Sequence, residues 1–209
     1  GDEVADFDSG LLNAEGRDVV VIGGGDTAMD CVRTAIRQKA NSVTCLYRRD
    51  RANMPGSQRE VANAEEEGVD FRWLSAPQAF LGDNHVRAVQ AQKIHLGQPD
   101  ATGRQVPQII EDSSHEIPAD LVIKALGFDP EDIPTMFGAP ELEVSKWGTI
   151  GVDWRTMMTN LPGVFAAGDI VRGASLVVWG VRDGRDAAES IHSYIMAQSE
   201  APRVAATGA

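Results

Sequence analysis

The chain has 209 residues, a formal net charge of −12 and a pI of about 4.7. This length allows one large domain or two small ones, each with a sizeable core. The acidic balance excludes a general nucleic-acid binder, which needs clustered Lys and Arg. No apolar run is long enough to cross a bilayer, and residues 1–9 do not resemble a signal peptide. Because only Cys31 and Cys45 are present, we expect a cytoplasmic protein without disulfides.

The first element follows an acidic surface lead-in that we expect over residues 1–15. The β-branched run Val19–Ile22 is typical of a buried parallel strand, and Gly23-x-Gly25-x-x-Ala28 follows it directly. In a dinucleotide-binding turn, the first glycine makes the tight turn and the second admits a pyrophosphate, while Ala28 keeps helix and strand close. We expect the helix over residues 27–39. The alternative is an ordinary strand-to-helix turn.

A second strand, expected over residues 42–47, ends in a basic segment. Dinucleotide folds that bind NAD place Asp or Glu near this point to accept from the ribose 2′-hydroxyl. Here Tyr47 is followed by Arg48, Arg49, Asp50 and Arg51. Guanidinium groups bind a 2′-phosphate, so the segment predicts NADP preference. The alternative is a solvated basic turn in which Asp50 neutralises one arginine.

The next segments predict a helix and then a small antiparallel insertion. Ser57-x-x-Glu60 has the form of a capping box, and Gly68 stands where the helix would stop, after a solvated acidic run at 65–67. Short alternating segments predict an antiparallel meander within an α/β frame. These segments are 70–74, 86–94 and 108–110, with turns at 82–84, Gly97 and Gly103. A buried strand returns at 121–126 and runs into Gly127.

Another informative stretch lies at Gly163–Asp169. An apolar strand is expected to end in Gly168-Asp169, with an apolar helix beginning near Ser175. A carboxylate there can accept from a ribityl or sugar hydroxyl, and the helix N-terminus can face an electron-rich flavin edge. Asp is also a common N-cap, so a purely structural role remains the alternative.

These residues resemble a known family. Thr159–Asp169 resembles the second flavin motif of two-dinucleotide flavoprotein reductases, and Leu126–Pro130 resembles their Gly-x-x-Pro hinge. Segments 23–31, 47–57 and 173–179 closely resemble the small (β) subunit of glutamate synthase, and the resemblance covers residues 16–195. It implies an α/β, Rossmann-like NAD(P)-binding domain of the glutathione/thioredoxin reductase type at 16–127, with an inserted antiparallel β meander. The C-terminal part of an FAD-binding domain would follow at 128–209.

The resemblance also implies a function and a set of site residues. The family takes hydride from NADPH and passes electrons through FAD and iron–sulfur clusters to a large (α) subunit, which makes glutamate from glutamine and 2-oxoglutarate. Gly127 would lie where the two cofactors approach. No residue is assigned as catalytic or as a metal ligand. The implied NADPH residues are Gly23, Gly24, Gly25, Asp26, Thr27, Arg48 and Arg49. The implied FAD contacts are Gly168, Asp169 and the backbone of Ser175, Leu176 and Val177.

The sequence departs from the family pattern in two respects. It contains neither an earlier glycine-rich motif for the ADP half of FAD nor the cysteines of the iron–sulfur clusters. We therefore expect an incomplete chain that is inactive alone and exposes part of its FAD domain, which offers a surface for homo-oligomers. Two alternatives remain. One is a related NADPH flavoprotein, ferredoxin:NADP reductase-like or pyrimidine-reducing. The other is a non-catalytic nucleotide-binding or docking module.

Overall fold

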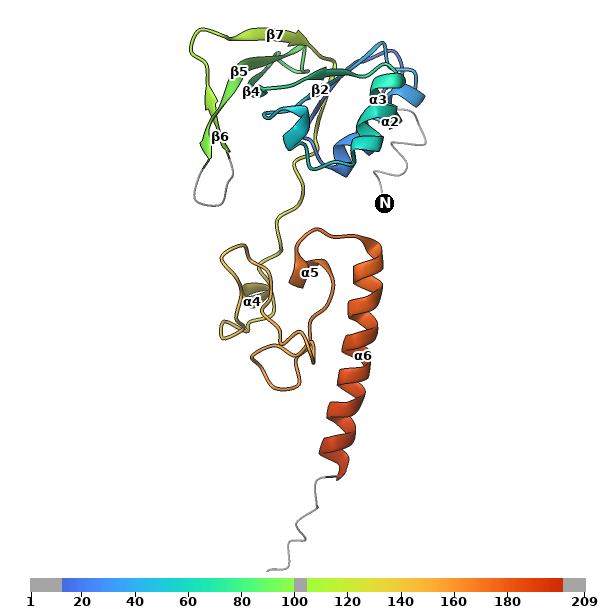
Figure 1. Ribbon diagram of the computed structural model, residues 1–209, viewed down its shortest axis with the longest axis vertical. Coiled ribbons are helices and arrows are strands. Elements are labelled where there is room, and N and C mark those ends of the chain that lie inside the picture. Colours follow the sequence, from blue (N-terminus) through green and yellow to red (C-terminus); the bar gives the residue numbers. More distant parts are fainter. Residues whose placement is uncertain (1–12, 100–104, 201–209) are drawn as a thin grey trace, which may run out of the picture. The chain divides into compact units, whose positions relative to one another are not determined.

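The computed structural model describes residues 13–99 and 105–200. The chain divides into two compact units, residues 1–127 and 128–209 (Figure 1). Residues 1–12 of the expected lead-in and the expected turn at Gly103 lie outside the described residues.

The first unit is built on a parallel sheet with strand order β3-β2-β1-β8. Each pair of neighbouring β-branched residues in β1 points to opposite faces, so both faces of this strand are apolar. One face carries Val19 and Val21, packed against two helices, and the other carries Val20 and Ile22. The strands are β1 (Asp18–Ile22), β2 (Ser42–Leu46), β3 (Asp70–Arg72) and β8 (Leu121–Lys124).

The two helices that cover the first face are α2 (Asp26–Arg37) and α3 (Gln58–Glu66). In α2, the buried side chains recur at helical spacing and form one apolar stripe. These buried residues are Ala28, Met29, Val32 and Ala35. The predicted helix therefore forms, and its apolar stripe brings its N-terminus to the end of β1.

The predicted antiparallel insertion forms, and its strands cover the other face of the parallel sheet (Figure 1). Strand β5 pairs with β4, β6 and β7. It continues through Gly97, which was expected to be a turn. The strands are β4 (Ser75–Leu81), β5 (Ala88–Pro99), β6 (Gln105–Ile109) and β7 (His115–Pro118).

Placing Asp70–Leu74 in the meander is wrong. Its strand β3 instead pairs in parallel with β2, with Phe71 opposite Cys45. Helix α3 supplies the crossover that parallel neighbours need, and Phe71 packs against the core below the helices. Three residues are too few to show this in the sequence pattern.

The predicted capping box at α3 does not form. The Ser57 side chain makes no capping hydrogen bond. The reciprocal bond from the Ser57 amide to Glu60 is also absent, because this amide donates to the Asp26 carboxylate and the Glu60 carboxylate pairs with Arg33. Gly68 has φ +99°, as a helix stop requires. The acidic run is not simply solvated, since Glu67 also binds Arg33.

The second unit contains little sheet within the described residues. The apolar strand expected before Asp169 is only an isolated bridge between Met158 and Phe165. A short helix begins at Asp169, so the helix expected near Ser175 is preceded by one more turn of helix. The helices are α4 (Ile133–Met136), α5 (Asp169–Arg172) and α6 (Val177–Glu200).

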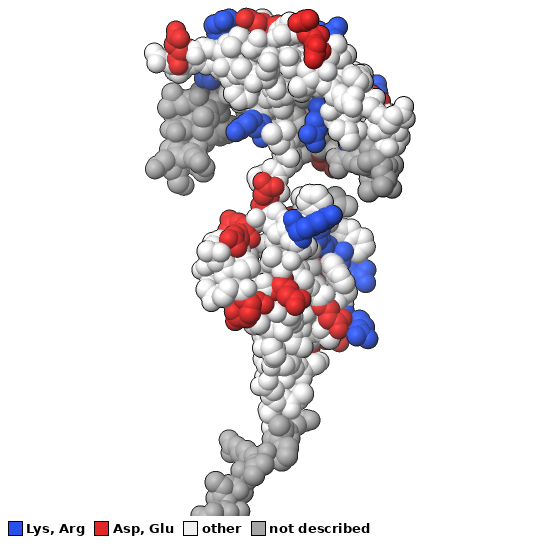
Figure 2. All heavy atoms as spheres, turned by 90° about the vertical axis from the view of Figure 1, so that its left-hand side faces the viewer, with Lys and Arg blue, Asp and Glu red and all other residues white. Residues whose placement is uncertain are grey.

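The structure can be compared with the expectations that the chain neither crosses a membrane nor binds nucleic acids generally. Among the described residues, no helix has both the length and the apolarity to cross a membrane. On the face shown in Figure 2, both units carry acidic as well as basic side chains, and neither presents a continuous basic surface there.

Candidate functional site

The turn between β1 and α2 has no room for side chains at its first two glycines. Gly23 has φ +149°, and a Cβ atom there would lie 2.1 Å from the carbonyl oxygen of Ala125. A Cβ at Gly24 would lie 2.4 Å from the Tyr47 ring. These two glycines are therefore required by the packing of the turn against β8 and the end of β2.

Gly25 is different, because the space beside it is open. It is the N-cap of α2, its backbone is extended, and a Cβ atom would meet nothing within 4 Å. No side chain caps this helix end. The first amides of a helix lack intrahelical partners, and the macrodipole makes this end positive. The turn is thus suited to accept an anionic group that approaches the backbone at Gly25.

The segment at residues 54–57 packs against one side of the turn. The amide of Gly56 donates to the carbonyl of Gly24 at 2.9 Å, and the amide of Ser57 donates to the Asp26 carboxylate at 2.9 Å. Met54 anchors the segment in the core with 5% of its surface exposed. The Asp26 carboxylate is therefore already engaged in a hydrogen bond within the protein, which holds this segment in place. Thr27, also expected at the site, is exposed at the start of the helix.

The arginines after β2 have different environments. Arg48 is exposed and makes no side-chain hydrogen bond or ion pair within residues 13–99 and 105–200. Arg49 is half-buried, and its Nη2 donates to the Gln105 carbonyl in β6 at 3.1 Å. Its Nε is buried and has no partner among the described atoms.

Asp50 does not neutralise an arginine, the role that the alternative gave it. Its carboxylate accepts from the backbone and side-chain amides of Asn53 and caps a short 3-10 helix, η1 (Arg51–Asn53). Arg51 is paired with Glu65 at 2.8 Å. Arg48 is therefore the arginine whose guanidinium is available to a ligand without breaking an existing contact.

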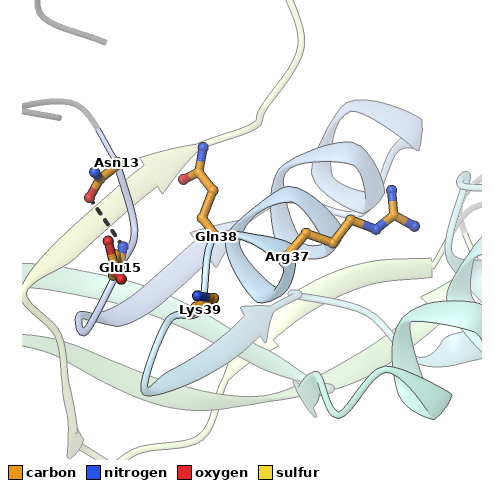
Figure 3. Close-up of a pocket in the computed structure, with 5 residues that line it drawn as sticks. All are labelled: Asn13, Glu15, Arg37, Gln38 and Lys39. Atoms are coloured by element: carbon orange, nitrogen blue, oxygen red, sulfur yellow. Dashed lines mark hydrogen bonds between the residues drawn. The ribbon is translucent and has the colours of Figure 1, made fainter. Parts of the chain in front are cut away.

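A polar surface hollow of about 290 Å³ lies at the other end of α2, away from the glycine turn (Figure 3). It is lined by Asn13, Glu15, Arg37, Gln38 and Lys39. Its walls include the last residue of α2 and the residues after it, whereas Gly25 caps the first turn. The hollow is thus separate from the predicted site.

In the second unit, the Gly168–Asp169 turn is braced by residues that the sequence analysis did not assign. Gly168 has φ +80° and caps α5, while the Asp169 side chain is exposed. Behind the turn, Asp183 of α6 is 1% exposed and accepts from Arg172 at 2.5 and 2.7 Å. Hydrogen bonds from Arg172 hold the pKa of this carboxyl below its ordinary value.

The remaining predicted site residues are exposed. Gly127 has φ +92° and ends the first unit, whereas Ser175, Leu176 and Val177 stand before or at the start of α6. Leu176 and Val177 are 62% and 83% exposed. The residues predicted to bind NADPH thus lie in the first unit, and those predicted to bind FAD lie in the second.

An iron–sulfur cluster does not fit the described residues. Among them, no group of three or more His, Cys, Asp or Glu side chains is arranged to hold a metal. Cys45 is buried, and burial raises the pKa of its thiol to about 12, which disfavours the thiolate that a metal needs.

Comparison with known proteins identifies the family. The pyridine nucleotide-disulphide oxidoreductase family matches residues 2–201. The chain belongs to this family. The chain is 69% identical to the glutamate synthase (NADPH) small chain of Azospirillum brasilense over 97% of its own length and 42% of that protein. It is 45% identical to the Escherichia coli K12 protein of the same name, over 90% of this chain and 41% of that one.

A solved structure shows the same fold. Thioredoxin reductase from Lactococcus lactis, crystallised in the FR conformation, matches with a TM-score of 0.72 and 25% identity over 92% of this chain and 57% of that one. The predicted fold class and the resemblance to glutamate synthase small subunits are confirmed. The chain spans less than half the length of these curated relatives.

Proposed function

We propose that this chain is the NADPH-binding part of a glutamate synthase small subunit and delivers hydride from NADPH toward FAD. The observation that carries the proposal is the open, uncapped helix N-terminus at Gly25, at the end of a buried parallel strand. Membership of a pyridine-nucleotide family and the names of the two relatives support the nucleotide and the reaction.

Each residue around the turn has a proposed task. Gly23 and Gly24 shape the turn, and Gly25 with the first amides of α2 receives the pyrophosphate. Asp26 and Thr27 lie at the first helical positions, where Asp26 also holds the segment at Ser57.

Recognition of the 2′-phosphate is divided between the two arginines. Arg48 supplies a free guanidinium, and charge-assisted hydrogen bonds from it would favour NADPH over NADH. Arg49 holds the end of β2 against β6 through its hydrogen bond to Gln105, and its positive charge would add to the attraction of the 2′-phosphate.

The second unit would contribute to the flavin site. Gly168 and Asp169 are proposed to meet the ribityl chain, and the backbone at Ser175, Leu176 and Val177 the flavin ring, with Gly127 near the approach of the two cofactors. The exposed Asp169 carboxylate can accept from a hydroxyl, which fits this task. The bound flavin would supply the hydride acceptor, while these residues would orient it.

The remaining parts of the reaction belong to regions beyond this sequence. Iron–sulfur clusters do not fit the described residues, so we assign them to the part of the longer relatives that this chain does not cover. We further propose a large glutamate synthase subunit as partner, a cytoplasmic setting, and self-association through the exposed start of α6 as a property of the isolated chain.

Titration of the purified chain with NADPH and NADH tests the proposal. We expect one NADPH per chain and at least tenfold weaker NADH binding, measured by calorimetry at fixed salt. Equal affinity for NADPH and NADH would contradict the assignment of the arginines to the 2′-phosphate. Absence of binding of both nucleotides would contradict the proposed function. In the holoenzyme, NADPH oxidation that depends on glutamine and 2-oxoglutarate would separate glutamate synthesis from the related reductases. NADPH binding without any turnover there would favour the docking module.

A further inference from the structure

Two residues outside every predicted motif meet behind the Gly168–Asp169 turn. Both oxygens of the Asp183 carboxylate accept from the Arg172 guanidinium, and the Arg172 amide donates to the Gly168 carbonyl at 3.0 Å. Asp183 is among the most buried side chains of the second unit, with 1% of its surface exposed. One buried carboxylate on α6 therefore holds Arg172, whose backbone is in turn hydrogen-bonded to Gly168 at the start of the turn.

We propose that Asp183 and Arg172 are positioning residues that fix the Gly168–Asp169 turn so that the Asp169 carboxylate is presented to the flavin. This inference rests on the proposed function for the identity of the ligand. Its structural half, that the pair holds the turn, can be tested without any flavin.

The turn needs such a support from elsewhere in the fold. Helix α5 has only 4 residues, and a single turn of helix is unstable by itself because nucleation fixes several dihedrals for few hydrogen bonds. Gly168 adopts φ +80°, and because glycine is conformationally permissive it does not hold this conformation by itself. Asp183, on the long helix α6, adds a constraint by holding Arg172, which is hydrogen-bonded to the Gly168 carbonyl.

The pair also requires the planar shape of arginine. The Arg172 guanidinium lies over the Trp154 ring at 4.7 Å and over the Trp179 ring at 5.1 Å. A guanidinium can stack on two aromatic faces while its edge donates in parallel to one carboxylate, which the single ammonium group of lysine cannot do. Arg172→Lys should therefore weaken the support even though the charge is retained.

Asp169 itself is left available by this arrangement. Its side chain is exposed and makes no hydrogen bond or ion pair within the described residues. The buried Asp183 carboxylate thus binds the Arg172 side chain at the end of the turn, and the exposed Asp169 carboxylate stays available for a ligand hydroxyl. Because Asp183 does not reach the ligand in this account, its effect on flavin binding would be indirect.

The first measurement is amide hydrogen exchange of the 209-residue chain, compared between Asp183→Asn and the matched control Asp186→Asn. Asp186 lies on the same helix, is exposed, and is 3.7 Å from Arg182. We expect at least tenfold faster exchange over residues 168–173 in Asp183→Asn and Arg172→Lys, with the first unit unchanged. Unchanged exchange of the segment in both variants would overturn the inference. If Asp183→Asn fails to fold, Arg172→Lys, which leaves a cation beside the carboxylate, decides the point.

The second measurement is FAD release from the holoenzyme, followed by flavin fluorescence. We expect Asp183→Asn and Arg172→Lys to weaken FAD binding about tenfold or more and to alter the visible flavin spectrum, while Asp186→Asn behaves as wild type. A loosened turn with unchanged flavin affinity and spectrum would make the pair structural only and overturn the positioning role. Failure of the wild-type holoenzyme to hold FAD would instead contradict the proposed function, and the inference with it, whatever the exchange of the turn.

Discussion

The main-chain amide of Ser57 donates a 2.9 Å hydrogen bond to the carboxylate of Asp26, the first residue of α2. This contact joins the start of one helix to the start of the next, because Ser57 is the N-cap of α3. It also explains why a carboxylate is tolerated beside a predicted phosphate site. The negatively charged Asp26 carboxylate accepts the Ser57 hydrogen bond and lies at a helix N-terminus, where negative charge is favourable.

Asp26→Ala should lower both stability and NADPH affinity, because it releases the segment that closes over the turn. Loss of one exposed hydrogen bond to a carboxylate suggests about 1 kcal/mol of unfolding free energy and a loss of affinity of about fivefold. Asp26→Asn keeps an acceptor for the Ser57 amide and removes a negative charge near the phosphates, so its NADPH affinity should be at least that of wild type. Calorimetric titration of both variants checks this, and weaker binding by Asp26→Asn would mean that the carboxylate contacts the nucleotide.

Arg48→Ala and Arg49→Ala should have separable effects. Arg48 has no other partner among the described residues, so its loss should weaken NADPH binding by about 1.5–3 kcal/mol and leave NADH binding and thermal stability nearly unchanged. Arg49→Ala should lower the melting temperature, since it removes the bond to Gln105. Melting curves and titrations with both nucleotides distinguish the two. An equal loss for NADPH and NADH in Arg48→Ala would contradict its assignment to the 2′-phosphate.

Glu67→Gln should change how stability depends on pH. Hydrogen bonds from Arg33 hold the pKa of Glu67 below its ordinary value, which is about 4.3. A lowered folded-state pKa contributes stability that is complete above the unfolded value and is lost as the pH falls through the folded one. Denaturant unfolding should thus show wild type more stable than Glu67→Gln at pH 7, with the difference shrinking below about pH 4. Glu66→Gln, an exposed neighbour, is the control, and a difference that stays constant down to pH 3 would contradict the account.

The purified 209-residue chain should bind NADPH and yet be colourless. The sequence contains one glycine-rich dinucleotide turn, at Gly23–Gly25, and the second unit leaves Val177 and Val178 at 83% and 66% exposed. A chain with only half of an FAD site should bind FAD more weakly than a complete site by several kcal/mol, and each 1.4 kcal/mol lowers the affinity tenfold. An absorption spectrum after gel filtration checks this. A stoichiometric flavin band would mean that these residues build a complete pocket.

Local features of this fold could be predicted from the sequence because they depend on neighbours in the chain. The run Val19–Ile22, the glycines and Ala28 specify strand, turn and helix within about ten residues. Gly68 was identified as a helix stop for the same reason, since only a glycine accepts its φ of +99° without strain.

Features that depend on distant partners could not be predicted. Strand β3 is three residues long, and only its pairing with β2 distinguishes it from the meander. Ser57 and Glu60 had the pattern of a capping box, but they do not bind each other. The Ser57 amide binds Asp26, and the Glu60 carboxylate binds Arg33. Nothing near Asp183 in the sequence indicates that it is bound to Arg172, 11 residues away.

We propose that Gly25 is a glycine because a nucleotide phosphate occupies the space beside it. A Cβ atom there meets no protein atom within 4 Å and the backbone angle is an ordinary one, so we expect Gly25→Val to keep the melting temperature close to that of wild type. The added side chain should fill the space at the helix N-terminus and abolish NADPH binding in a calorimetric titration. Folded Gly25→Val that bound NADPH with wild-type affinity would contradict this account of the turn.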